Sequence, residues 1–266
     1  MQKIHPKTLQ DLEFPTVLEQ IAARCNTELG KLEAMEIRPL TDTTFLRNIL
    51  GQTSEYLASF SNDNRIPNHG FDHINGELKL LGIENTTLEI SGFRRIASIC
   101  KTVELHQKFL KKFKEYYPLL FEYSSQLEGN SQIPASIDAV IDKFGEIRDN
   151  ASDELRHLRI QINEVRAKIN QSFAAALGRY QGQDYLDEIR ESVVENRRVL
   201  AVKAMHRKKV KGTVMGTSKT GSIIYIVPET TLGHTRELSN LEFEEKEEIQ
   251  RILNQLTTDI RPFQEL

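Results

Sequence analysis

The sequence predicts a mainly α-helical protein: an all-helical core and a long antiparallel coiled-coil arm that a small β-rich region caps. Three observations favour this fold class. Apolar residues recur at helical spacing from Phe14 to beyond residue 140. From Asp153, a long segment carries only one narrow apolar stripe. Between residues 193 and 228, short runs rich in β-branched residues and separated by glycines replace the helical pattern.

Residues 1–143 are predicted to form the helical core. Apolar stripes at helical spacing run through residues 14–60, where Pro39 and the pair Thr41-Asp42 supply a break and a helix cap. Further helices are expected at residues 90–114, 119–127 and 133–141. Loops and turns that contain Asn, Gly or Pro separate these segments. The core is therefore expected to be a compact unit of helices.

Residues 144–192 are assigned to an outgoing helix of the arm, and residues 229–266 to a returning helix. Most positions between the apolar residues of 153–180 are charged or carry amides, so the helix needs one partner rather than a broad core. Helical spacing resumes at 235–260, which makes this segment the predicted antiparallel partner. The apolar positions are Leu155, Leu158, Ile162, Val165 and Ile169 in the first helix, and Leu238, Leu241, Ile249, Ile252, Leu253 and Leu256 in the second.

Residues 193–228 form the predicted β region, with strands expected at 193–194, 198–203, 211–215 and 223–227. The run from Gly216 to Ser222 has the glycine spacing of a phosphate-binding loop. However, Ser222 and Ile223 follow Gly221 where that loop needs Lys and then Ser or Thr, and a strand follows instead of a helix. The run is therefore interpreted as a hairpin turn in which Gly216 and Gly221 allow positive φ.

Positive charge is concentrated in the β region, although the net charge of the chain is −3. Lysine and arginine side chains at the end of an arm can bind phosphates without reading base sequence. The alternative is a solvated strand edge, where lysines discourage aggregation. The candidate nucleic-acid-binding residues are Arg197, Arg198, Lys203, Arg207, Lys208, Lys209, Lys211 and Lys219.

Other candidate sites are weaker. The loop His69-Gly-Phe-Asp72-His73 has two imidazoles and a carboxylate but lacks a further obvious ligand, so no metal site is expected. No constellation of residues predicts a catalytic site. Cys25 and Cys100 are expected to be buried, reduced thiols of a cytoplasmic protein. No apolar run approaches the roughly 18 residues of a membrane span, so no membrane partner is expected.

Three stretches of the chain resemble the second MutS paralogue of bacteria, a family of MutS-type ATPases linked to the control of recombination. The first lies near the start and comprises Thr8 to Phe14, Val17 to Ile21, Glu28 to Gly30 and Arg38-Pro39-Leu-Thr. The second, Gly145 to Arg159, resembles the turn that leads into the MutS lever helix. The third resembles the clamp-region block and comprises Glu195 to Lys203, Val210 to Val214 and Ser218 to Glu229. Gly216 and Arg236-Glu-Leu-Ser-Asn240 depart from the family pattern.

This resemblance implies that the chain corresponds to the core, lever and clamp regions of a longer protein. In that protein an ATPase domain is expected after about Pro262, with a small MutS-related nuclease domain at the C-terminus. The complete protein is then expected to bind ATP and Mg, to form a homodimer and to act as an ATPase and endonuclease. Its expected partners are branched or mismatched DNA, or ribosomal RNA in stalled ribosomes that it helps to split. No cofactor is expected in the residues present here.

A second hypothesis is a coiled-coil scaffold that contacts proteins and no nucleic acid. It depends on the acidic returning helix, where five glutamates are concentrated, and on an apolar stripe that a second copy of the chain is able to cover. The five glutamates are Glu242, Glu244, Glu245, Glu247 and Glu248.

Overall fold

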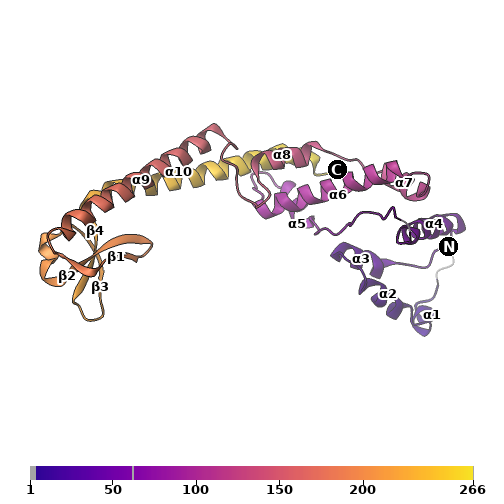
Figure 1. Ribbon diagram of the computed structural model, residues 1–266. Helices are drawn as coiled ribbons and strands as arrows, with labels where there is room; N and C mark the ends of the chain where they lie inside the picture. The colour runs from indigo at the N-terminus through magenta and orange to yellow at the C-terminus, as the bar shows by residue number, and fades with distance from the viewer. Residues whose placement is uncertain (1–3, 62, 266) are drawn as a thin grey trace. The chain divides into compact units, whose positions relative to one another are not determined.

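The computed structural model describes residues 4–61 and 63–265, which divide into two compact units (Figure 1). Unit 1 comprises the chain before Asp149 together with the segment from Leu253 onward, and unit 2 is Asp149–Ile252. Helices predominate in the described residues, and the named strands form one four-stranded antiparallel sheet, in unit 2. The mainly α fold class is confirmed.

Unit 1 is built from helices. Tyr117 and Phe93 are fully buried in its core, and the Tyr117 hydroxyl donates a hydrogen bond of 2.8 Å to the carbonyl of Asn64. Thr257 is also buried; its Oγ1 accepts a hydrogen bond from the amide of Leu88 and donates one to the carbonyl of Leu253. The helices that begin in unit 1 are α1 (Pro6–Asp11), α2 (Phe14–Ala22), α3 (Glu28–Glu36), α4 (Thr43–Ser59), α5 (Asn75–Leu81), α6 (Ile90–Lys112), α7 (Pro118–Ser125), α8 (Gln132–Val140) and the short η2 (Arg261–Phe263).

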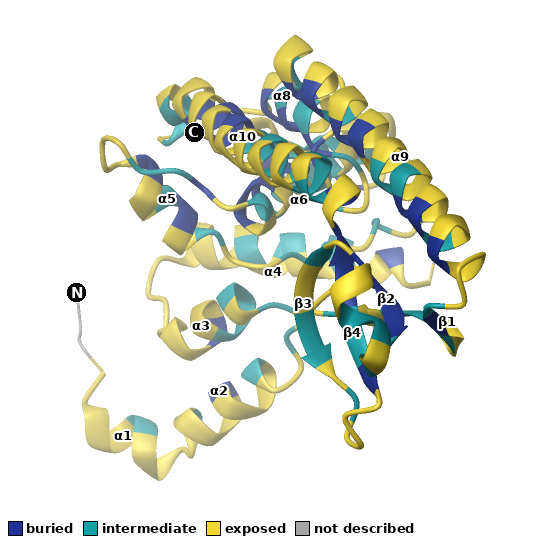
Figure 2. Ribbon diagram, turned by 90° about the vertical axis from the view of Figure 1, so that its left-hand side faces the viewer, coloured by how far each residue is buried: buried dark blue, intermediate teal, exposed yellow. Residues whose placement is uncertain are grey.

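The first four helices bury little of their apolar surface. Leu18 and Ala34 are the buried apolar residues of α1–α3 among those described, and most of these helices are coloured as exposed in Figure 2. The predicted helical stripes are therefore present, but they are mostly exposed. The exposed large apolar residues of this segment are Ile4, Leu12, Val17, Ile21, Leu32, Met35, Ile37, Leu40, Phe45, Leu46, Leu50, Leu57 and Phe60.

Unit 2 begins with the long helix α9 (Asp153–Gln181), which starts where the sequence predicts. The Ser152 hydroxyl caps the helix by accepting a hydrogen bond from the amide of Leu155. Of the predicted apolar stripe, Ile169 is half-buried and the other four members are buried. The stripe then continues through Phe173, Ala176 and Tyr180, which are also buried.

Helix α10 (Glu229–Ile260) runs antiparallel to α9 in unit 2. It begins directly after Pro228, six residues before the apolar residues resume helical spacing in the sequence at Thr235. Polar contacts join the two helices, and their order shows the direction, because residue numbers rise along α9 while they fall along α10. The contacts are Ser152 with Glu248, Arg159 with Glu245, Arg166 with Glu242, and Ser172 with the carbonyl of Thr230.

The sheet lies at the end of α9 and has the strand order β1-β2-β4-β3. One of its faces packs on α9, where Leu200, Val202 and Ile226 meet Phe173 and Tyr180 in a buried cluster. A short 3₁₀ helix, η1 (Ala204–Lys209), follows the second strand. The strands are β1 (Leu186–Val194), β2 (Arg197–Lys203), β3 (Gly212–Thr217) and β4 (Ile223–Pro228).

Two features of the sheet differ from the expectation. Strand β1 begins at Leu186, seven residues before the predicted strand, and its pairing with β2 is interrupted at a bulge that contains Arg190 at φ 62°. Gly221 has the expected positive φ of 72° in the β3–β4 turn, but Gly216 does not have positive φ and lies at an irregularity of β3 instead. The glycine that the fold requires is Gly212, because a Cβ there would lie 2.1 Å from the carbonyl oxygen of Val227.

The buried Glu248, which joins Ser152 at the start of α9 to Arg251 of α10, gives the stability of the fold a pH dependence. Hydrogen bonds from Arg251 and from Ser152 hold the pKa of Glu248 below its usual value of 4.5, although burial opposes them. A carboxylate whose pKa is lowered by folding stabilises the fold above its unfolded pKa. That contribution is lost as the pH falls through the folded pKa.

We therefore expect Glu248→Gln to lower the free energy of unfolding at pH 7 by about 1–2 kcal/mol, because the bonds from Arg251 lose their charge. Urea unfolding followed by circular dichroism measures the difference, which should shrink as the pH falls below 4.5. The exposed neighbour Glu247→Gln is the matched control and should change stability little at either pH. An equal effect of both substitutions would contradict this account of the contact.

Candidate nucleic-acid interface

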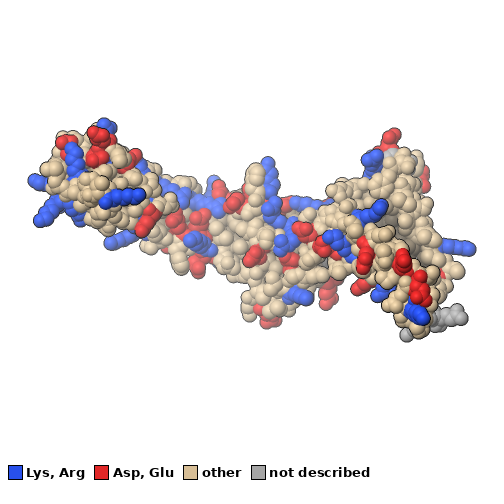
Figure 3. All heavy atoms as spheres, turned by 90° about the horizontal axis from the view of Figure 1, so that it is seen from below, with Lys and Arg blue, Asp and Glu red and all other residues tan. Residues whose placement is uncertain are grey.

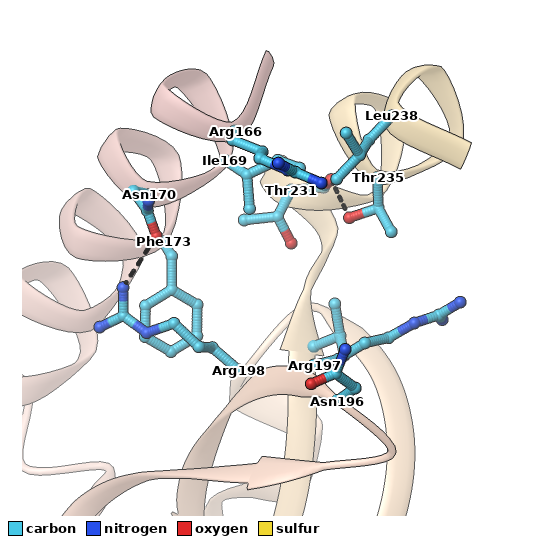
Figure 4. Close-up of a pocket in the computed structure, with 11 residues that line it drawn as sticks. Arg166, Ile169, Asn170, Phe173, Asn196, Arg197, Arg198, Thr231, Thr235 and Leu238 are labelled. Carbon is cyan, nitrogen blue, oxygen red and sulfur yellow. Dashed lines mark hydrogen bonds between the residues drawn. The ribbon is translucent and has the colours of Figure 1, made fainter. Parts of the chain in front are cut away.

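Strand β2 directs two neighbouring arginines to opposite faces of the sheet, because side chains alternate along a strand. Leu200 and Val202 are buried against α9, so Arg198 shares their face. Its guanidinium carbon lies 4.3 Å from the centroid of the Phe173 ring. Arg197 points away from this ring (Figure 4) and is exposed. The packing of the sheet thus decides which arginine is free to meet a partner.

Two of the eight candidate cations already have acidic partners inside unit 2. Arg198 donates to Glu191 on the adjacent strand at 2.6 Å and to Asn170 of α9 at 3.3 Å. Lys203 forms an ion pair with Asp184, and that lysine holds the pKa of the Asp184 carboxyl below its usual value. Both side chains therefore have a structural role that competes with binding a phosphate.

The other six candidates form no ion pair within residues 4–61 and 63–265. Arg207 is half-buried and donates a hydrogen bond of 3.3 Å to the carbonyl of Val210. Lysine and arginine side chains project from the sheet end of unit 2, at the left of Figure 3, with acidic side chains among them. The five exposed candidates that lack an ion pair are Arg197, Lys208, Lys209, Lys211 and Lys219.

A backbone hydrogen bond joins the start of η1 to the β3–β4 turn. The amide of Ala204, at the start of η1, donates a hydrogen bond of 2.9 Å to the carbonyl of Ser222 in the turn. Lys208 and Lys209 belong to η1, and Lys219 belongs to the turn. Two residues close to Lys219 in the sequence, Thr220 and Ser222, carry hydroxyl groups, and these form a hydrogen bond of 2.8 Å with each other. This surface can offer charge and hydroxyl hydrogen bonds to phosphate oxygens.

Two residues of this region are not among the candidates predicted from the sequence. Arg179 of α9 lines a cavity of about 360 Å³ together with Lys211 and Thr230, so it adds a cation that lies far from the others in the sequence. Met205 of η1 is 82% exposed within the cationic run. A large apolar residue between cations was visible in the sequence, but its exposure was not.

A second cavity, of about 290 Å³, lies between α9, the start of α10 and the β1–β2 turn (Figure 4). Arg166, Asn170 and Arg198 contribute polar groups, and Phe173 and Leu238 contribute apolar walls. No Asp, Glu, His, Cys or Ser is among its lining residues. Two hydroxyl groups, those of Thr231 and Thr235, are also among the polar groups that line the cavity.

The weaker candidates have other surroundings. The ring of His69 packs edge-on against Tyr56 and His106, and no metal-binding cluster of His, Cys, Asp and Glu occurs among the described residues. Cys25 and Cys100 are both half-buried free thiols, and burial raises the pKa of Cys100. Across residues 4–61 and 63–265, no helix has the length and apolar character that a membrane span requires.

The different surroundings of Arg197 and Arg198 predict different effects on stability. We expect Arg198→Gln to destabilise unit 2 by about 1 kcal/mol, because a partly exposed cation–π contact and a partly exposed ion pair are lost. Arg197→Gln should change stability by less than about 0.5 kcal/mol, as is usual for an exposed side chain. Urea unfolding of the two variants measures the difference. Equal stabilities would show that the contact of Arg198 with Phe173 does not hold the sheet.

The sequence of this chain is similar to parts of known proteins. The chain is 30% identical over 254 residues to Endonuclease MutS2 of Pelotomaculum thermopropionicum. The aligned region covers 96% of this chain and 32% of that protein. It is 28% identical over 268 residues to Endonuclease MutS2 of Leuconostoc mesenteroides, covering 97% and 33%. It is 27% identical over 254 residues to the Putative endonuclease MutS2 of Bacillus subtilis, covering 94% and 32%.

These relatives agree with the family that the sequence motifs indicate. No protein-family model matches the chain. The chain spans about a third of the length of the curated relatives that it matches. It is therefore similar, over almost all of its own length, to one part of proteins named Endonuclease MutS2.

Proposed function

We propose that the chain is the nucleic-acid-binding core, lever and clamp region of a MutS-type ATPase. In this proposal the sheet end of unit 2 contacts the phosphates of a bound polymer, and α9 with α10 forms the lever that carries it. One observation carries the proposal: the sheet region has five exposed cations without an ion pair. No acidic residue occurs from Arg197 to Pro228 to oppose them. A phosphate backbone is the partner that such a surface fits best.

The helices support the role of a lever. Helix α9 has 29 residues, which corresponds to about 43 Å at 1.5 Å per residue. Its contacts with α10 are ion pairs and hydrogen bonds along the pair as well as a buried stripe. Such a pair can carry a movement made at one end to a sheet fixed at the other end. In the longer protein that movement would come from an ATPase domain that binds ATP and Mg and forms a homodimer.

The chemistry of the surface predicts binding that depends on charge more than on base sequence. Lysines, hydroxyl groups and an arginine position a backbone, whereas reading bases requires side chains that enter a groove. Branched or mismatched DNA and ribosomal RNA both offer such a backbone. Endonuclease activity is proposed for the longer protein, in line with the names of its relatives. Suppression of recombination and the splitting of stalled ribosomes are proposed for it from the resemblance of the sequence motifs alone.

A second candidate function is binding of another protein through α1–α4. It is favoured by the exposed apolar side chains of these helices, which a monomer rarely leaves uncovered in such number. The acidic helix α10 offers less support for a scaffold than its sequence suggests. Glu242, Glu245 and Glu248 are already bonded to residues of α9 or of α10 itself.

The nucleic-acid proposal is tested by removing three exposed charges together: Lys208→Gln, Lys209→Gln and Lys219→Gln. The affinity for a DNA duplex should fall, and the slope of log affinity against log salt should become shallower by up to about three units. Each lost phosphate contact removes about one unit of slope. Fluorescence anisotropy with a labelled duplex over a series of salt concentrations measures both quantities, and a labelled ribosomal RNA helix provides the second polymer.

The matched control removes the same charge from a different surface. Lys111, Lys112 and Lys114 are also exposed, at the end of α6 and just beyond it, and their triple change to Gln should leave affinity and slope unchanged. Equal losses in the two triple variants would show a general effect of charge and would refute the sheet end of unit 2 as the contact. Sedimentation that shows concentration-dependent self-association and no duplex binding would favour the second candidate function.

A further inference from the structure

Met205 is the most exposed large apolar side chain in the described part of the protein, at 82% exposure. It lies in η1, between Lys203 and the run His206-Arg-Lys-Lys209. Exposed apolar residues are common when they stand singly on a polar surface. The position of Met205 is unusual because the surrounding surface is cationic and because the segment that carries it is firmly attached.

Contacts on several sides fix η1 to the sheet. The amide of Ala204 bonds to the carbonyl of Ser222 at 2.9 Å, and Val210, directly after η1, is buried in the core of the sheet. The ring of His206 packs against the ring of Tyr185, with 4.8 Å between the centroids. Met205 therefore projects from an anchored segment, so its exposure does not come from a loosely attached loop.

The residues around Met205 carry positive charge. A 3₁₀ helix has three residues per turn, so Lys208 lies on the same side of η1 as Met205. The β3–β4 turn with Lys219 adjoins η1 through the bond between Ala204 and Ser222. An apolar protein surface would have to cover these cations without compensating charge. A nucleic acid matches both features, because phosphates meet the lysines and stacked bases offer an apolar interior.

We propose that Met205 inserts between neighbouring bases of a bound DNA duplex, at a step where stacking is already weakened by a mismatch or a branch point. This inference rests on the proposed function. Apolar side chains such as Met act as wedges in several DNA-bending proteins, and opening a base step costs least where pairing is already defective. The unbranched thioether chain of Met adapts to irregular gaps. Met205 thus gives a phosphate-binding surface a preference for interrupted duplexes.

The test uses two DNA duplexes of equal length, one fully paired and one with a central mismatch, each with the fluorescent base 2-aminopurine at the centre. Binding of the unchanged protein should raise the fluorescence of the mismatched duplex, because the labelled base becomes unstacked. Met205→Ala should abolish this rise and lower the affinity for the mismatched duplex by about tenfold, because no apolar side chain then fills the opened base step. Its affinity for the paired duplex should stay within about twofold.

Two further variants identify the cause. Met205→Leu keeps an apolar wedge and should retain the rise in fluorescence. Val193→Ala removes an apolar side chain that is 64% exposed on β1, outside the cationic run, and should change nothing. Binding of the unchanged protein to both duplexes with no rise, or a rise that survives in Met205→Ala, would overturn the wedge and leave the phosphate contact standing. The absence of any binding would overturn both proposals.

Discussion

The packing of the sheet on the last turns of α9 is the interaction on which the rest of unit 2 depends. Leu200, Val202 and Ile226 are fully or almost fully buried against Phe173 and Tyr180, and burying each such side chain stabilises the fold by about 1.5–3 kcal/mol. Because side chains alternate along β2, this packing also turns Arg198 toward Phe173 of α9, whereas Arg197 lies exposed on the other face, beside α10. The apolar packing thus determines that Arg198 contacts the protein itself and that Arg197 remains exposed.

Charge is distributed unevenly in unit 2: acidic residues lie along the helix pair, and cations lie in the sheet region. Glu242, Glu245 and Glu248 of α10 are occupied by bonds to α9 or to Arg251, so much of the acidic charge of the helix pair is neutralised where it stands. The sheet region from Arg197 to Pro228 has no acidic residue of its own. The surface that remains free to attract a polyanion is therefore concentrated over η1 and the β3–β4 turn, where Lys208 and Lys219 lie.

The periodicity of the sequence predicted the structural features that neighbouring residues determine. It could not predict the features that depend on contacts between residues far apart in the chain. The stripe of α9 and the cationic run were visible in the sequence. The start of β1 was hidden because charged residues fill its first half and Arg190 interrupts the alternation. The need for Gly212 follows from the backbone of a strand that comes later in the chain. The ion pair of Arg198 with Glu191 depends on strand register, and the helical spacing of α1–α4 could not show that their apolar side chains stay mostly exposed.

Hydroxyl-radical footprinting of the whole chain, with and without a bound DNA duplex, tests the central claim most directly because it reports each side chain's exposure. The account predicts that the duplex protects η1, the β3–β4 turn and Arg197, with the readily oxidised Met205 among the residues affected. Helices α1–α8 should keep their reactivity. Protection confined to unit 1 or to the acidic middle of α10, with η1 still fully reactive, would contradict the account.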